Sequence, residues 1–285
     1  MRNQRTEQEM RELILDTARR DERVRLVGMN GSRVNPNAPK DDFQDYDIVY
    51  AVTEMESFLS EPEWIDVFGK RLIMQTPQTS ALFPSQPGGR FSYLMLFTDG
   101  NRIDLTLMPI RDIDHYEQED SLTDILLDKD GRITAPVSSS DRDYWIKPPS
   151  AAVYGDCCNE FWWITTYVAK GLARGEILYA QHHLNQHARP MLLLMLEWQA
   201  GIDTGFSASA GKNSKCLKKY LPEKEWYSLL ATYAGGEIED IWRALFEMIG
   251  LFRRTANRVG SHFQFVYPLE EDRRVTRYLQ EIKNI

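Results

Sequence analysis

The most informative stretch of the chain is residues 31–47, Gly-Ser-Arg-Val-Asn-Pro-Asn-Ala-Pro-Lys-Asp-Asp-Phe-Gln-Asp-Tyr-Asp. They connect two apolar runs, at 24–29 and 48–52. If both runs are β-strands, Asp45 and Asp47 open the second strand and point to the same face, because side chains alternate along a strand. Adjacent carboxylates repel each other unless a cation lies between them. The stretch therefore predicts a site of oxygen ligands, the kind that Mg²⁺ prefers.

A turn at Gly31 and Ser32 directly follows the first apolar run. Backbone N–H groups and a hydroxyl in such a turn can bind a phosphate. A purely structural interpretation is also available for the acidic pair, since Asp favours turns and strand ends whatever the function. The Asp-x-Asp pair alone therefore does not decide between the two interpretations.

A third carboxylate favours the functional interpretation. Residues 102–108, Arg-Ile-Asp-Leu-Thr-Leu-Met, are typical of a strand and follow a turn at 99–101. The alternation places three aliphatic residues on one face and Asp104 on the other. A charged residue in an apolar strand needs a partner or a solvated environment. Three carboxylates on neighbouring strands beside a Gly-Ser turn indicate phosphoryl-transfer chemistry with metal ions.

The composition limits the class of protein. A chain of 285 residues with 42% hydrophobic residues suggests one large or two ordinary domains. A net charge of −8 argues against a general nucleic-acid binder and suits a cationic partner. The polar N-terminus shows no signal peptide, no apolar run is long enough to span a membrane, and the three cysteines lack metal-ligand spacing. We therefore expect a cytoplasmic protein with reduced thiols and no membrane partner.

The first half of the chain predicts a mixed α/β domain around one sheet, at 1–136. A capping box beginning at Thr6 starts a helix, and Ser60 is a second N-cap candidate because Pro62 follows it. The segment 76–90, rich in proline and glycine, is either a wall of the site or an ordinary surface loop. Strands are expected at 24–29, 48–52, 71–75, 91–98 and 102–108.

The second half, 137–285, predicts a helical domain after a linker region at 136–150. Ser150 caps the first long helix, and Pro190 should kink or break the second. Helices are expected at 150–172, 176–198, 223–233, 237–259 and 269–282. The fold class is therefore α+β, a mixed-sheet domain followed by a helical bundle domain.

Candidate binding residues in the helical domain are less specific. Lys170 lies late in the first long helix, and Lys215 belongs to Gly211-Lys-Asn-Ser-Lys, which we expect to open a short helix. Each lysine is also a plausible surface charge. Asp156 and Glu160 share a helix face, where they either meet a cation or are solvated. Trp162 either packs in the core or lines a ligand pocket.

Three histidines, at 182, 183 and 187, are close in sequence. Two of them are spaced i, i+4, as two metal ligands on a helix are. The run His-Leu-Asn-Gln-His lacks the glutamate of the zinc-protease pattern. We expect these rings to pack or to lie on a helix surface.

The arrangement of Gly31-Ser32, Asp45-x-Asp47 and Asp104 resembles the nucleotidyltransferase superfamily that includes DNA polymerase β. The segments LVGMNGSRVN, FQDYDIVY, NRIDLTLMP, EFWWITTYVAKGLARGE and HARPMLLLMLEW are similar to those of the aminoglycoside 6-adenylyltransferases, the streptomycin-modifying group. The resemblance covers nearly the full length, and the three carboxylates match its motif.

This resemblance implies a polymerase β-like domain, a helical substrate- or nucleotide-binding domain, and antibiotic bound between them. It implies transfer of AMP from ATP to the 6-hydroxyl of streptomycin, with release of pyrophosphate and hence antibiotic resistance. Asp45 and Asp47 then hold Mg²⁺, and Asp104 is the general base and a contact of a second metal. The phosphates are bound by a set of four residues: Gly31, Ser32, Lys170 and Lys215. The negative net charge of the chain agrees with such a substrate, because the guanidinium groups of streptomycin would bind carboxylates and aromatic faces.

Three rival functions remain open at this stage. One is transfer to another small hydroxylated cation. The second is a nucleic-acid polymerase, which the negative charge disfavours. The third is a non-catalytic nucleotide-binding module, which has no need of three carboxylates. The sequence leaves the oligomeric state undecided.

Overall fold

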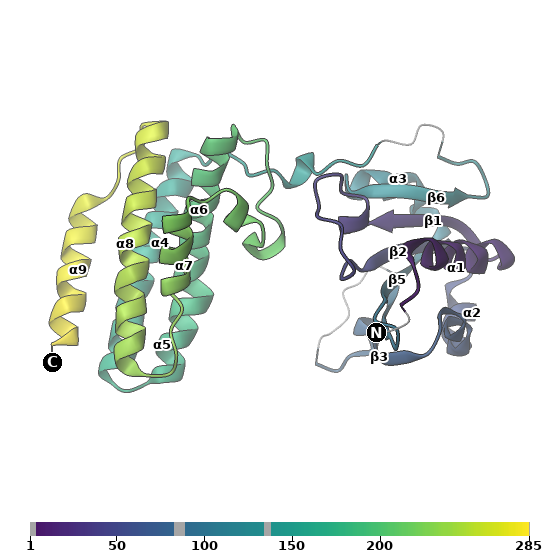
Figure 1. The fold of residues 1–285 in the computed structure, drawn as a ribbon, viewed down its shortest axis with the longest axis horizontal. Coiled ribbons are helices and arrows are strands. Elements are labelled where there is room, and N and C mark those ends of the chain that lie inside the picture. Colours follow the sequence, from purple (N-terminus) through teal and green to yellow (C-terminus); the bar gives the residue numbers. More distant parts are fainter. Residues whose placement is uncertain (1–3, 83–88, 134–137, 285) are drawn as a thin grey trace. The chain divides into compact units, whose positions relative to one another are not determined.

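A computed structural model describes residues 4–82, 89–133 and 138–284, which form two compact units, Met1–Asp143 and Tyr144–Ile285 (Figure 1). Each unit has a hydrophobic core of its own. The first is built on a six-stranded sheet, and the described residues of the second form helices and turns. The predicted α+β fold class is confirmed. The predicted boundary between residues 136 and 137 falls outside the described residues.

The sheet of the first unit has the strand order β3-β4-β5-β2-β1-β6. Its strands are β1 (Val24–Asn30), β2 (Tyr46–Val52), β3 (Arg71–Gln75), β4 (Phe91–Phe97), β5 (Arg102–Pro109) and β6 (Thr123–Asp128). Neighbouring strands are antiparallel except β2 and β5, which are parallel. The five predicted strands are confirmed. Strand β6 was not predicted, because acidic residues at 124 and 128 interrupt its short apolar run.

Side-chain alternation divides the sheet into two covered faces. One face packs under α1 (Glu7–Arg20), α2 (Met55–Ser60) and the 3₁₀ helix η2 (Pro62–Phe68). The other face packs under α3 (Ile113–Glu119), which supplies Ile113 and Tyr116 to a smaller core. The predicted capping box of α1 is present, with Thr6 and Glu9 bonding each other's backbone N–H.

The expected N-cap at Ser60 is wrong. Ser60 is the last residue of α2, and the 3₁₀ helix η2 begins two residues later with Glu61 as its N-cap. Pro62 lacks an N–H and disfavours helical backbone at the preceding residue, so it ends α2 rather than extending a helix from Ser60.

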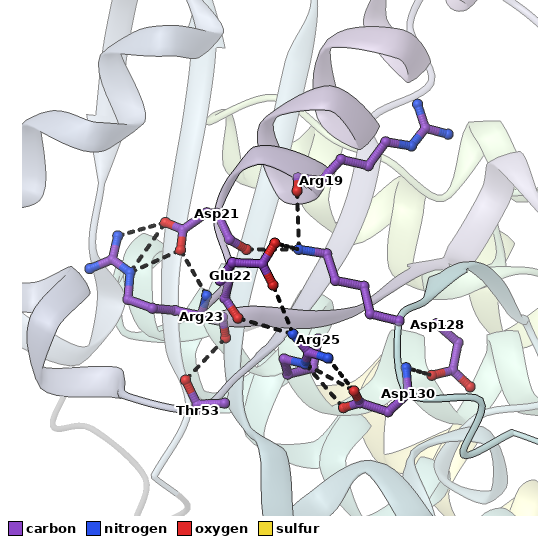
Figure 2. Close-up of polar contacts among 9 residues, drawn as sticks. Arg19, Asp21, Glu22, Arg23, Arg25, Thr53, Asp128 and Asp130 are labelled. Carbon is purple, nitrogen blue, oxygen red and sulfur yellow. Dashed lines mark hydrogen bonds and ion pairs between the residues drawn. The ribbon is translucent and has the colours of Figure 1, made fainter.

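A network of charges fastens the start of β1, at the opposite end of this strand from Gly31 (Figure 2). Arg23 pairs with Asp21 at 2.6 Å, and Arg25 pairs with both Glu22 and Asp130. The Lys129 ammonium donates to two carbonyl oxygens at the end of α1. These bonds tie α1, β1 and the segment after β6 together, and we interpret them as structural.

The second unit contains six α-helices in its described residues (Figure 1). They are α4 (Ala151–Ala173), α5 (Ile177–His183), α6 (Arg189–Thr204), α7 (Glu223–Ala231), α8 (Ile238–Phe263) and α9 (Leu269–Lys283). The hydroxyl of Ser150 caps α4 as predicted, accepting the Val153 N–H at 3.2 Å. Phe161 of α4 stacks on Phe252 of α8 with ring centroids 3.7 Å apart. No helix in the described part of the chain is long and apolar enough to cross a membrane.

The expected interruption near Pro190 is present as one π-helical turn, η6 (Leu184–Ala188), between α5 and α6. Proline in a helix removes one backbone hydrogen bond and crowds the carbonyl four residues earlier. The chain relieves this crowding by widening the preceding turn, where the Arg189 N–H donates to the Leu184 carbonyl.

A buried carboxylate holds α9 against α8. Asp272 is 1% exposed and accepts hydrogen bonds from Arg253 Nε at 2.6 Å, the Tyr267 hydroxyl at 2.8 Å and the Thr276 hydroxyl at 3.1 Å. Burial alone would raise the pKa of Asp272, but the hydrogen bonds outweigh burial and lower that pKa. The ionised carboxylate is therefore part of the folded state of the second unit.

Candidate active site

Three polar side chains form one row across the centre of the sheet. Asn30 of β1 pairs in register with Asp47 of β2, and Asp47 pairs with Asp104 of β5. Neighbouring strands lie about 4.8 Å apart, so the two carboxylates are adjacent on one face. The opposite face of β5 carries Ile103 and Leu105 in the core, as the alternation predicted. The structure thus brings together two carboxylates that lie far apart in the sequence.

Asp45 lies just before β2, which begins at Tyr46. Its carboxylate contacts a cation supplied by β5, since its Oδ2 is 3.5 Å from Nη1 of Arg102. Arg102 therefore connects the segment before β2 to β5. All three predicted carboxylates lie at one end of the β2–β5 pair.

Gly31 provides the space that Asp47 occupies. A Cβ at Gly31 would lie 2.4 Å from Oδ2 of Asp47, and the backbone φ there is +78°. The Gly31 N–H donates to the Leu122 carbonyl at 3.1 Å, and phosphate binding by Gly31 stays a prediction. The adjacent Ser32 hydroxyl and N–H are the groups of this turn that could meet one.

Arg33 ties this turn to the acidic segment. Its side chain is 8% exposed, and it donates from Nε to the Asp45 carbonyl at 3.1 Å and from Nη2 to the Gln44 carbonyl at 2.7 Å. The guanidinium stacks 3.6 Å from the ring centroid of Tyr46. Gln44 in turn donates to the Ser32 carbonyl at 3.0 Å. The Gly-Ser turn and Asp45 therefore keep a fixed relation to each other.

A second chain of bonds fixes Asn30 from the other side. Tyr116 of α3 donates to Oδ1 of Asn30 at 2.5 Å, and Asn30 Nδ2 donates to the Thr123 hydroxyl at 2.6 Å. The Tyr116 ring lies over Gly28, where a Cβ would be 2.1 Å from the hydroxyl oxygen. Burial raises the pKa of Tyr116, so it remains a neutral hydrogen-bond donor.

Arg102 binds the carboxylate of Asp104 with both arms of its guanidinium, Nε to Oδ1 at 2.8 Å and Nη2 to Oδ2 at 2.7 Å. This hydrogen bonding is the largest cause of a raised pKa of Arg102. The negative charges of Asp104, Asp45 and Asp47 raise that pKa further. Both oxygens of Asp104 are engaged by a cation. Each oxygen keeps a further lone pair that can accept the proton of a hydroxyl.

The carboxylates of this site are ligands that suit Mg²⁺, although they do not surround a common centre in the structure. In the ranges that the structure describes, no group of three His, Cys, Asp or Glu side chains is close enough to hold a metal ion. Mg²⁺ is commonly held by one or two carboxylates and by substrate phosphates. Asp45 and Asp47, both partly exposed beside the Gly-Ser turn, provide carboxylate oxygens for such an arrangement.

The two lysines predicted in the second unit have different settings. The Lys170 ammonium lies 4.9 Å from the ring centroid of Tyr167 on the same helix. The expectation that Lys215 lies at a helix N-terminus is wrong. Residues Lys212–Ser214 form a single 3₁₀ turn in which Asn213 has a left-handed backbone, and Lys215 is its C-cap. Loop preferences of Gly211 and Asn213 prevent a regular helix here.

The acidic candidates on α4 are exposed, whereas the aromatic one is not. Asp156 and Glu160 are both solvent-exposed, and their contact with a substrate stays a prediction. Trp162 is 1% exposed and packs against Phe161 and Phe252 in the core of the second unit. Of the two alternatives for Trp162, packing in the core is the one observed, because the hydrophobic effect buries this indole. Its neighbour Trp163 is the exposed one.

The histidines pack on one another, as expected. The ring centroids of His182 and His183 are 5.5 Å apart, and those of His183 and His187 are 5.3 Å apart. Tyr179 packs on His183 at 4.3 Å. Burial lowers the pKa of His183, and the two neighbouring imidazoles lower it further. This cluster lies in the second unit, and the carboxylate row lies in the first.

The structure adds four residues that sequence reasoning missed at this site, namely Asn30, Arg33, Arg102 and Tyr116. Two of them had a readable signal. Arg102 and Asp104 are two apart on a strand, so they share a face. Asn30 has the same parity as Leu26, so it lies on the face of β1 that carries the smaller core. Nothing local in the sequence indicates the bonds of Arg33 or Tyr116, since these join segments that only the fold brings together.

Comparison with known proteins identifies relatives that match nearly the whole chain. Residues 4–282 match the family model described as streptomycin adenylyltransferase. The chain is 48% identical to an aminoglycoside 6-adenylyltransferase of Bacillus subtilis and 46% identical to one of Campylobacter jejuni, covering 98% and 95% of those proteins and 98% and 96% of this chain. A crystal structure of an aminoglycoside 6-adenyltransferase from Bacillus subtilis aligns with 98% of this chain and 99% of its own, at 45% identity and a TM-score of 0.49. The resemblance noted from the sequence is confirmed, and the chain belongs to the streptomycin adenylyltransferase family.

Proposed function

We propose that this protein transfers AMP from ATP to the 6-hydroxyl of streptomycin, releases pyrophosphate, and thereby confers resistance to the antibiotic. The observation that supports this most strongly is the pairing of Asp47 with Asp104 beside Gly31, in a chain that matches the family over residues 4–282. ATP as co-substrate suits a cytoplasmic enzyme.

In this proposal, the residues around the carboxylates have different tasks. Asp45 and Asp47 hold Mg²⁺, which when bound neutralises charge on the triphosphate as it develops. Ser32 contacts the phosphates, and Gly31 leaves room for Asp47. Arg33 holds the Asp45 segment in place through two backbone carbonyls.

Asp104 would contact a second metal ion, and it accepts the proton of the acceptor hydroxyl as that oxygen attacks the α-phosphorus. The new P–O bond forms as the bond to the pyrophosphate oxygen breaks, so the leaving group carries the negative charge away. General-base catalysis of this kind commonly contributes about 10²- to 10⁴-fold in rate. Lys170 and Lys215 neutralise the leaving charge in this scheme, and Asp156 and Glu160 bind cationic groups of the antibiotic.

The test is a direct assay. The protein is incubated with ATP, Mg²⁺ and each member of an aminoglycoside panel, and pyrophosphate release and the mass of the modified antibiotic are measured. We expect release with streptomycin and a product carrying one AMP at the 6-position. Release with another aminoglycoside alone would assign a different acceptor. Absence of release with every acceptor, from a folded protein that still binds ATP, would favour a non-catalytic module.

A further inference from the structure

Arg102 places its guanidinium among the carboxylates that the proposed function assigns to the metal. Its two bonds to Asp104, at 2.8 and 2.7 Å, have the planar two-pronged geometry typical of strong arginine–carboxylate pairs. A third nitrogen lies 3.5 Å from Asp45. One cationic side chain therefore spans two of the three carboxylates.

A metal ion and this guanidinium compete for the same atoms. A carboxylate oxygen that accepts a hydrogen bond from arginine offers fewer lone pairs to a cation, and two cations a few ångströms apart repel each other. The absence of a three-carboxylate cage in the described residues agrees with this, because Asp104 is turned to Arg102 rather than to a shared centre.

We propose that Arg102 is an internal counter-ion, which holds Asp104 and Asp45 in the free protein and must release them before a divalent cation binds. This rests on the proposed function, which puts the metal at these carboxylates. The Arg102 side chain is 41% exposed at the first residue of β5, so it has room to swing away. A bound triphosphate offers it new oxygen acceptors, so metal and nucleotide bind together more readily than the metal alone.

The test measures metal binding without any turnover. Mn²⁺ is titrated into the nucleotide-free protein, and free Mn²⁺ is followed by electron paramagnetic resonance. Arg102→Gln should bind Mn²⁺ at least about tenfold tighter than the unchanged protein, because it removes a positive charge a few ångströms from the ion. Arg102→Lys keeps the charge without the two-pronged geometry and should give an intermediate affinity.

The matched control is Arg25→Gln. It removes the same charge from the same unit, from a side chain that pairs with Asp130 and Glu22 near the start of β1 (Figure 2). Its Mn²⁺ affinity should stay unchanged. An equal gain in Arg25→Gln and Arg102→Gln would show a general effect of net charge and would overturn the proposal.

Adding Asp47→Asn separates the two ideas. If Asp47→Asn abolishes Mn²⁺ binding both alone and combined with Arg102→Gln, the metal site stands. The affinity gain of Arg102→Gln alone then decides the role of the arginine. No gain then overturns the internal counter-ion only. If Asp47→Asn leaves Mn²⁺ binding intact in both backgrounds, the metal lies elsewhere and both ideas fail. Thermal unfolding checks each variant; should Arg102→Gln not fold, an unchanged affinity in Arg102→Lys overturns the proposal.

Discussion

The carboxylate of Asp47 lies against the α-carbon of Gly31, so closely that any Cβ at position 31 would come within 2.4 Å of Oδ2. The same glycine has a left-handed backbone, with φ at +78°. Residue 31 therefore meets two separate requirements. Backbone conformation alone would tolerate an alanine with some strain, but the space is already taken by the carboxylate.

Gly31→Ala should lower kcat/KM for adenylyl transfer by about 100-fold or more, because a shift of about 1 Å in a reacting group has that effect. Circular dichroism should show the fold retained. Gly131→Ala is the matched control, since Gly131 also has positive φ, at +62°, with nothing within 4 Å of a Cβ. Equal losses in the two variants would mean that backbone strain, and not displacement of Asp47, is responsible.

Asp104→Asn and Asp47→Asn should fail in different ways. The first removes the proton acceptor, which should cost about 10²- to 10⁴-fold in kcat while ATP affinity is largely kept. The second removes a metal ligand and should weaken binding of Mg²⁺-ATP as well. Asp16→Asn, at an exposed pair on α1, is the control. Equal collapse of ATP affinity in both site variants would make Asp104 chiefly a metal ligand.

Glu160→Gln tests whether the acids of α4 select a cationic antibiotic. If Glu160 binds a guanidinium or ammonium group, the KM for streptomycin should rise several-fold, and the KM for ATP should not. The effect should shrink as salt increases, because exposed charges are screened. Glu281→Gln, on exposed surface of α9, is the control. An unchanged streptomycin KM would return Glu160 to the solvated surface.

Asp272→Asn should destabilise the second unit by about 2 to 3 kcal/mol, in line with hydrogen bonds to charged groups. Because the folded-state pKa of Asp272 is lowered, its stabilisation is present above the unfolded pKa, near 4, and is lost as pH falls through the folded pKa. Denaturant unfolding at pH 7 and below pH 4 should show this loss in the unchanged protein and not in the variant. Asp240→Asn, at an exposed pair with Arg243, should change stability by less than about 0.5 kcal/mol.

Alternation along single strands was sufficient to predict much of this site. The parity of Asp104 against Ile103 and Leu105 gave its face correctly, and the parity of Asp47 against Ile48 did the same. The helices of the second unit followed from the spacing of apolar residues and from Ser150 as a cap. These are local regularities, which the sequence states directly.

The remaining features depend on contacts that no local pattern describes. The parallel pairing of β2 with β5 is a choice of partner among strands, and periodicity does not encode it. Arg33 was missed because its acceptors are main-chain carbonyls, which every residue has. Trp162 had two open interpretations, because an aromatic residue on an amphipathic helix suits a core and a pocket equally well until the packing is known.

Because the site depends on the parallel pairing of β2 with β5, it forms only when the sheet has folded correctly. Strands β3 and β4 intervene in the sequence, so this pairing is a long-range contact that requires a large loop to close. A slip of one residue would turn Asp104 to the opposite face. A chain whose sheet is incomplete or misaligned has no row of carboxylates, so enzymatic competence arises only together with native strand alignment.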